Sequence, residues 1–164
     1  MTHEDARPKS DVLMLEATGL GRAGDYAGAI RAARRALVQA RREGRADASG
    51  ALLFMSHAAS SLGRLPLARR YARHAIKEAP DEWICLSTHA NLEFDAGNGM
   101  DRDNAVLCFR RAVQGYEQAL VIAARKKADA EAVRTLRAKL AKAKDTLKKA
   151  GEPGETPMER RTDP

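Results

Sequence analysis

The sequence predicts an all-α protein built from antiparallel helix pairs that stack one after another. Its 164 residues include 32 alanines, while aromatic residues make up only 4%. Alanine is the strongest helix former and lets helix backbones approach closely, so this composition favours packed helices over a sheet. In addition, a turn followed by a helix with one small, apolar face occurs three times along the chain.

Each of the three copies carries two alanines that lie two helical turns apart on one face. The pairs are Ala29 and Ala36, Ala68 and Ala75, and Ala105 and Ala112, so the copies recur after 39 and 37 residues. In the first copy the Gly24-Asp25 turn precedes an apolar stripe formed by Tyr26, Ala29, Ile30, Ala33, Ala36 and Leu37. A helical unit of this length cannot bury its own apolar face, and it therefore has to stack on a neighbour.

This repeat resembles the tetratricopeptide repeat (TPR) family over about residues 10–127. The resemblance is carried by Gly24, Tyr26, Ala29 and Ala36 in the first copy, by Gly63, Ala68, Ala75 and Pro80 in the second, and by Gly97, Ala105, Phe109 and Ala112 in the third. It implies a right-handed TPR-like α-solenoid with repeats at about 10–44, 46–80 and 81–127. Residues 98–102 lengthen the internal turn of the third copy.

The individual helices are predicted from their caps, breakers and stripes. We expect helices at about 11–22, 26–43, 46–62, 65–78, 81–96, 102–127 and 129–150. Ser10 is the predicted cap of the first helix and Asp101 that of the sixth, whereas Gly44 ends the second. The seventh helix, with a narrow Val and Leu stripe, fits a terminal capping element. Residues 1–9 and 151–164 are polar and are expected to be disordered.

The length of the sixth helix depends on Gly115. The apolar stripe of that helix continues through the glycine, so we predict one long helix at a cost of roughly 1 kcal/mol. The alternative is that Gly115-Tyr116 begins a fourth repeat.

The net charge of +7 can be assigned to the C-terminal segment, because residues 125–149 hold ten bases and three acids. The basic helix contributes Arg134, Arg137, Lys139, Lys142 and Lys144. Three interpretations stay open: a solvated capping helix, a surface for a partner or for homo-oligomerisation through its Leu stripe, and a site for phosphates or an anionic membrane surface. No aromatic residue interrupts the run, so no platform for base stacking exists and nucleic acid is not an expected partner.

No catalytic or metal-binding pattern is present. The histidines lack the i, i+4 spacing of a metal-binding helix, and Cys85 and Cys108 do not form a Cys-x-x-Cys pair. We therefore expect no enzymatic activity, no cofactor and no metal. Two cysteines are too few for a disulfide framework, and no segment has the apolar length of a secretion signal or a membrane span. A cytoplasmic location is expected.

The family resemblance also implies a binding groove lined by the first helix of each repeat. Carried over to this sequence, the groove residues are Met14, Thr18, Arg22, Leu53, His57, Ser60, Ile84 and Asn91. A TPR subclass clamps chaperone-tail carboxylates with cationic side chains from these helices, but residues 81–100 contain no Lys or Arg. A mixed apolar and polar lining suits an extended segment or an amphipathic helix with a few apolar anchors.

The expected function is a non-catalytic scaffold or adaptor that holds another protein in the groove. This expectation rests on the resemblance, since a fold alone does not fix a function. One alternative is a TPR chaperone similar to those of type III secretion. The other is binding of nucleic acid or an anionic surface through the basic helix.

Overall fold

A computed structural model describes residues 8–44 and 48–151. Seven helices lie within these ranges: α1 (Lys9–Arg22), α2 (Tyr26–Arg42), α3 (Ala48–Ser61), α4 (Leu65–Glu78), α5 (Trp83–Gly97), α6 (Arg102–Arg125) and α7 (Ala130–Gly151). The disorder predicted for the two termini falls mostly outside the described residues, although Lys9 and Gly151 are helical.

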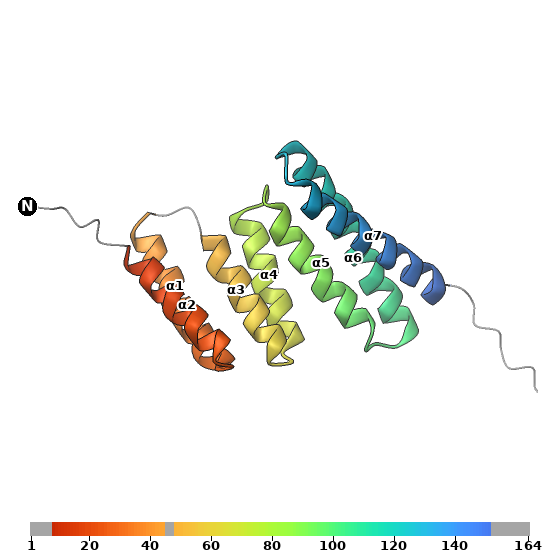
Figure 1. The fold of residues 1–164 in the computed structure, drawn as a ribbon. Coiled ribbons are helices and arrows are strands. Elements are labelled where there is room, and N and C mark those ends of the chain that lie inside the picture. Colours follow the sequence, from red (N-terminus) through yellow and green to blue (C-terminus); the bar gives the residue numbers. More distant parts are fainter. Residues whose placement is uncertain (1–7, 45–47, 152–164) are drawn as a thin grey trace, which may run out of the picture.

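The helices follow one another along an elongated stack, with α1 and α7 at its opposite ends (Figure 1). Consecutive helices form the antiparallel pairs α1/α2, α3/α4 and α5/α6, and α7 packs on α6. We call α1, α3, α5 and α7 the inner layer and α2, α4 and α6 the outer layer. The predicted all-α stack of helix pairs is confirmed.

The turns between helices follow the expected chemistry in most places. Asp25 and Asp101 cap α2 and α6 by accepting backbone N–H groups of Gly28 and Asn104. The side-chain and backbone N–H groups of Asn104 both donate to Asp101, and these two hydrogen bonds hold the pKa of the Asp101 carboxyl below its usual value. Gly63 has a φ of 69°, which a residue with a side chain adopts only with strain.

The prediction for Ser10 is wrong. Helix α1 begins at Lys9, and Pro8 occupies the cap position without a side-chain bond. Ser10 lies inside the first turn, where its Oγ donates a hydrogen bond of 2.5 Å to Glu43 Oε2 at the end of α2. A serine suited to a helix cap instead joins the two helices of the first pair, because proline tolerates the start of a helix.

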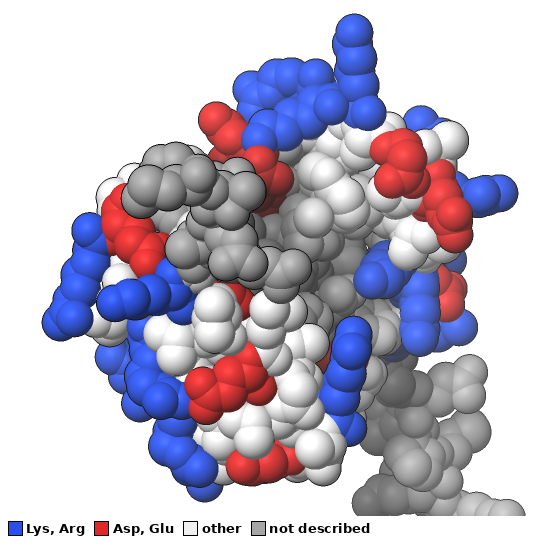
Figure 2. Space-filling model, turned by 60° about the vertical axis from the view of Figure 1, so that its left-hand side comes forward, with Lys and Arg blue, Asp and Glu red and all other residues white. Residues whose placement is uncertain are grey.

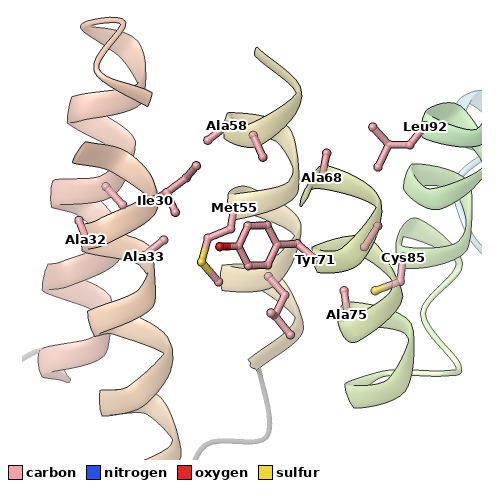
Figure 3. Packing of buried hydrophobic residues seen from close by; sticks show 14 residues of the cluster. Ile30, Ala32, Ala33, Met55, Ala58, Ala68, Tyr71, Ala75, Cys85 and Leu92 are labelled. Carbon is pink, nitrogen blue, oxygen red and sulfur yellow. The ribbon is translucent and has the colours of Figure 1, made fainter. Parts of the chain in front are cut away.

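The repeated alanines lie where the helices touch. Ala29, Ala68, Ala75 and Ala112 are fully buried. The first hydrophobic core lies among α1 to α5, and Figure 3 shows the Tyr71 ring of α4 beside Met55 of α3. Small residues on the facing helices leave room for these two large side chains, which explains how a chain poor in aromatics fills its interior.

Helix α6 is continuous through Gly115 for 24 residues, so the alternative of a fourth repeat starting there is wrong. A Cβ at Gly115 would lie 2.9 Å from the Cβ of Ala90 on α5, closer than ordinary packing allows. The glycine therefore permits close approach of the two layers, which offsets its helix propensity cost.

Helix α7 closes the stack. A second hydrophobic core lies among α5, α6 and α7. Leu136 and Ala143 of α7 are buried in it, and Val133, Leu140 and Leu147 pack against it. The predicted apolar stripe is thus covered within the chain. Homo-oligomerisation through α7 stays a prediction, and it would have to use the charged faces of this helix.

Candidate functional site: a hollow in the inner layer

The inner layer contains a hollow of about 370 Å³ where α3, α5 and α7 converge. Three of the predicted groove residues line it together: His57 and Ser60 on α3 and Asn91 on α5. Its remaining lining comes from α5, α6 and α7, as Thr88, Leu92, Phe94, Asp95, Tyr116, Lys139 and Lys142. We call this hollow the groove site.

Asn91 is held in place from the outer layer. Tyr116 of α6 is buried, and its hydroxyl donates a hydrogen bond of 2.7 Å to Asn91 Oδ1. Burial raises the pKa of Tyr116 to about 12, so the phenol stays a neutral donor. The bond fixes the amide orientation and directs the oxygen of Asn91 to Tyr116, which leaves the amide N–H groups for another partner.

Lys139 and Lys142 bring positive charge into the groove site from α7. The Nζ of Lys142 lies 5.4 Å from the centroid of the Phe94 ring, within range of a cation–π contact. From the sequence, the basic helix and the groove are expected to be separate surfaces. The structure joins them, because α7 occupies the inner-layer position that the first helix of a fourth pair would take.

The other residues predicted for the groove lie in different places. Leu53 and Ile84 line a second hollow of about 440 Å³ between α3 and α5, and Met14 lines a third of about 270 Å³ between α1 and α3. Thr18 donates its hydroxyl to the carbonyl of Met14 at 2.8 Å, and Arg22 is exposed at the end of α1. The eight predicted residues therefore do not form one site.

The rest of the basic helix faces outward. Arg134 and Arg137 are exposed, and Lys144 pairs with Glu117 of α6 at 2.8 Å. Arg125 of α6 and Lys126, which follows it, pair with Asp81 and Glu82 just before α5, at the same end of the third pair. Part of the positive segment is thus paired with acids of the same chain.

A buried ionic cluster joins the layers beside the groove site. Glu93 of α5 is 2% exposed, and both of its oxygens accept hydrogen bonds from Arg69 of α4. The Nε2 of His89 lies 3.4 Å from Glu93 and makes no hydrogen bond. Burial lowers the pKa of His89 more than Glu93 raises it, so the imidazole is neutral near pH 7.

In the described part of the chain, no three His, Cys, Asp or Glu side chains converge as a metal site would require, and no helix there is long and apolar enough to cross a membrane. Cys85 and Cys108 are buried thiols. Burial raises the pKa of the Cys108 thiol, which disfavours the reactive thiolate.

Comparison with solved structures decides the fold family. The TPR domain of Sgt2 from Aspergillus fumigatus superposes with a TM-score of 0.71 at 22% identity, covering 96% of this chain and 91% of that one. The chain has the fold of a TPR domain. It is thus a right-handed α-solenoid of about three repeats with a C-terminal helix, as predicted.

Two further TPR structures match over most of their length. One is the TPR2B domain of yeast Sti1 in a complex with pHsp70, with a TM-score of 0.67 at 17% identity, covering 84% of this chain and 98% of that one. The other is the type III secretion chaperone SycD of Yersinia enterocolitica in complex with a peptide of the translocator YopD. It matches with a TM-score of 0.68 at 15% identity, covering 92% of this chain and 100% of that one. No protein-family model and no curated protein sequence matches the chain.

Proposed function

We propose that this TPR protein is a non-catalytic scaffold that binds a segment of another protein in the groove site. The observation that carries the proposal is the hollow of about 370 Å³ in which three inner-layer helices present side chains to one space. The helices are packed on their outer-layer partners before any ligand arrives. The ordering cost of binding therefore falls on the partner segment rather than on this protein.

The lining indicates the chemistry of the segment. Hydrogen-bond donors come from Asn91, Lys139 and Lys142, an acceptor comes from Asp95, and Leu92 and Phe94 supply apolar surface. Such a mixture suits an extended segment or one face of an amphipathic helix, with a few apolar anchors between polar side chains. The peptide complexes of Sti1 and SycD support this mode of binding for the fold.

A second candidate is a chaperone similar to SycD. It is favoured by the match over the whole length of that chaperone. Co-expression with a secreted protein that is insoluble alone distinguishes the two, because a chaperone would keep that protein in solution. A scaffold would leave it insoluble.

The groove is tested with a phage-displayed library of random peptides. Peptides enriched on the wild type are synthesised, and their affinity is measured by calorimetry for the wild type and for a His57→Glu/Lys142→Glu variant. His57 and Lys142 are exposed, so the substitutions should leave the fold intact. We expect micromolar binding that weakens at least tenfold in the variant, because it places two carboxylates in the groove site and removes the Lys142 ammonium.

The matched control reverses two bases on the outer layer, Arg70→Glu/Arg73→Glu, which leaves the groove site unchanged. It should bind the peptides as the wild type does. If both variants bind equally well, or if the library yields no peptide, the groove site is not the binding surface.

A further inference from the structure

The outer layer carries a second basic surface, whose residues come from two separate stretches of the sequence. Helix α2 holds five arginines and no acidic residue. Helix α4 holds three arginines and one lysine against a single acid, Glu78. The inner-layer helix between them, α3, contains no charged residue at all. The bases of α2 and α4 thus belong to one layer, although α3 separates them in the chain.

Four of these nine bases already have partners. Arg34 donates to the hydroxyl of Tyr71, and Arg69 is paired with the buried Glu93. Arg35 pairs with Glu16 of α1, and Arg41 pairs with Glu78 of α4. The acids Glu16 and Glu78 are therefore engaged in ion pairs.

The other five bases are exposed and form no ion pair with the described residues 8–44 and 48–151. We call them the outer basic surface: Arg31, Arg42, Arg70, Arg73 and Lys77. Arg31 and Arg42 are eleven residues apart, close to three full turns, so they share one side of α2. Arg70, Arg73 and Lys77 are spaced i, i+3, i+7 and share one side of α4.

The two groups are adjacent because α2 and α4 are tied together. The bonds from Arg34 to Tyr71 and from Arg41 to Glu78 join these helices at two levels. Seen from the α1 end of the stack, Lys and Arg side chains line the left-hand margin of the molecule, and others stand at its upper and right-hand edges (Figure 2). The five bases, which have no ion-pair partner among the described residues, therefore lie on two neighbouring helices of the outer layer.

Three kinds of anionic partner could meet such a surface, and the residues favour one. A membrane would need an apolar anchor beside the charges, and the only exposed large hydrophobic residue on the described part of α2 or α4 is Val38. An acidic protein would gain little, since exposed ion pairs contribute only about 0–1 kcal/mol each. A nucleic acid releases condensed counterions for every phosphate that is neutralised, so it binds through charge alone.

We propose that the outer basic surface binds the phosphate backbone of a nucleic acid without reading the bases. Four of the five residues are arginines, whose guanidinium fork fits phosphate oxygens. The surface offers no exposed aromatic ring on which bases could stack. This surface lies on α2 and α4, whereas the alternative drawn from the sequence placed binding of nucleic acid or an anionic surface on α7.

The size of the surface fixes the expected salt dependence. Eleven residues of helix span roughly 16 Å, a length of duplex axis that carries about ten phosphate charges. Five bases neutralise at most about five of these, so the logarithm of the binding constant should fall with the logarithm of salt concentration with a slope of about −4.5.

The test uses fluorescence anisotropy with the full chain and a labelled DNA duplex of about 20 base pairs, from about 50 to about 300 mM KCl. A labelled RNA duplex distinguishes the two nucleic acids. The variant R31Q/R42Q/R70Q/R73Q/K77Q removes the surface. We expect the wild type to bind the duplex with a Kd of roughly 10 μM near 150 mM salt. The variant should bind at least about tenfold more weakly, and the salt dependence of its binding constant should have a slope close to zero.

A second variant, R134Q/R137Q/K139Q/K144Q/K148Q, removes the same charge from α7 and should bind within about threefold of the wild type. Circular dichroism checks that both variants remain helical. No duplex binding at about 50 mM salt, or an equal loss in both variants, overturns the proposal. So does binding to vesicles with about 30% anionic lipid but not to either duplex, which would assign the surface to membranes.

Discussion

The inner and outer layers of the solenoid differ most in where their charge lies. The inner helices α1 and α3 carry equal numbers of acids and bases, and α5 carries two acids and no base. The outer helices α2 and α4 carry nine bases and one acid. Helices α1 to α4 together hold eleven bases and three acids, and the acids that offset this excess in the net charge lie elsewhere, for example the six in residues 81–103. The same chain therefore presents a nearly neutral groove wall on α3 and a basic outer side.

A buried ion pair, Arg69 with Glu93, links the two layers. We expect Glu93→Ala to lower the free energy of unfolding by about 3 kcal/mol, because it leaves the half-buried arginine without its carboxylate. Urea denaturation measures the effect. The control is Glu16→Ala, which removes an exposed pair with Arg35 and should cost less than about 0.5 kcal/mol. Equal losses would show that burial does not set the strength of these links.

Close approach of the layers at Gly115 gives the next largest effect. Gly115→Ala places a methyl group 2.9 Å from Ala90 and should lower stability by roughly 2 kcal/mol, although alanine is the better helix former. Ala90→Gly in the same chain should restore most of the loss by removing the opposing methyl. A double-mutant cycle by thermal denaturation measures this coupling. Purely additive losses would mean that the two helices do not meet at this pair.

The turns that connect the layers should respond differently to a methyl group. Gly63 adopts a positive φ of 69°, so Gly63→Ala should cost about 1 kcal/mol of backbone strain. Gly99, in the turn of the third pair, has open space around it and no positive φ, so Gly99→Ala should change stability by less than about 0.5 kcal/mol. Chemical denaturation of both variants compares the turns. Similar losses at both positions would contradict the assigned conformations.

The smallest expected effect is a pH dependence from His89, which is packed among Glu93, Arg69, Arg73 and Arg111. Its pKa is lowered in the folded protein, so below the ordinary value of 6.5 the unfolded chain binds more protons. Stability contributed by neutral His89 is therefore present above pH 6.5 and is lost as pH falls below it. His89→Gln should show a flatter change in unfolding free energy between about pH 7.5 and pH 5. An unchanged slope would exclude this role for the imidazole.

Much of the fold could be predicted from local patterns. The alanine pairs, the glycine turns and the Asp101 cap are short-range signals, and they located all seven helices to within about two residues in the described ranges. Ser10 was misassigned because a serine before an apolar stripe fits a cap equally well from sequence. Its actual partner, Glu43, lies 33 residues away and is brought near only by the packing of α1 on α2.

The candidate site was harder to predict than the fold. The sequence could place His57 and Asn91 on one side of the repeat, whereas the contributions of Lys139 and Lys142 to the same hollow depend on how α7 sits against α5 and α6. The repeat pattern could have predicted the position of these two lysines, because helices of the inner and outer layers alternate along the chain and α7 is the next helix after an outer one. Assigning α7 to the inner layer would have placed its lysines in the groove.

The uninterrupted α6 helix has a consequence for rebuilding this protein. At about 1.5 Å per residue its 24 residues form a rod roughly 36 Å long that α5 and α7 share. Because α5 and α7 both pack on this one helix, α5, α6 and α7 should be transferred together when the protein is redesigned. Extra repeats are better spliced at residues 79–82, where α4 ends and a new pair begins.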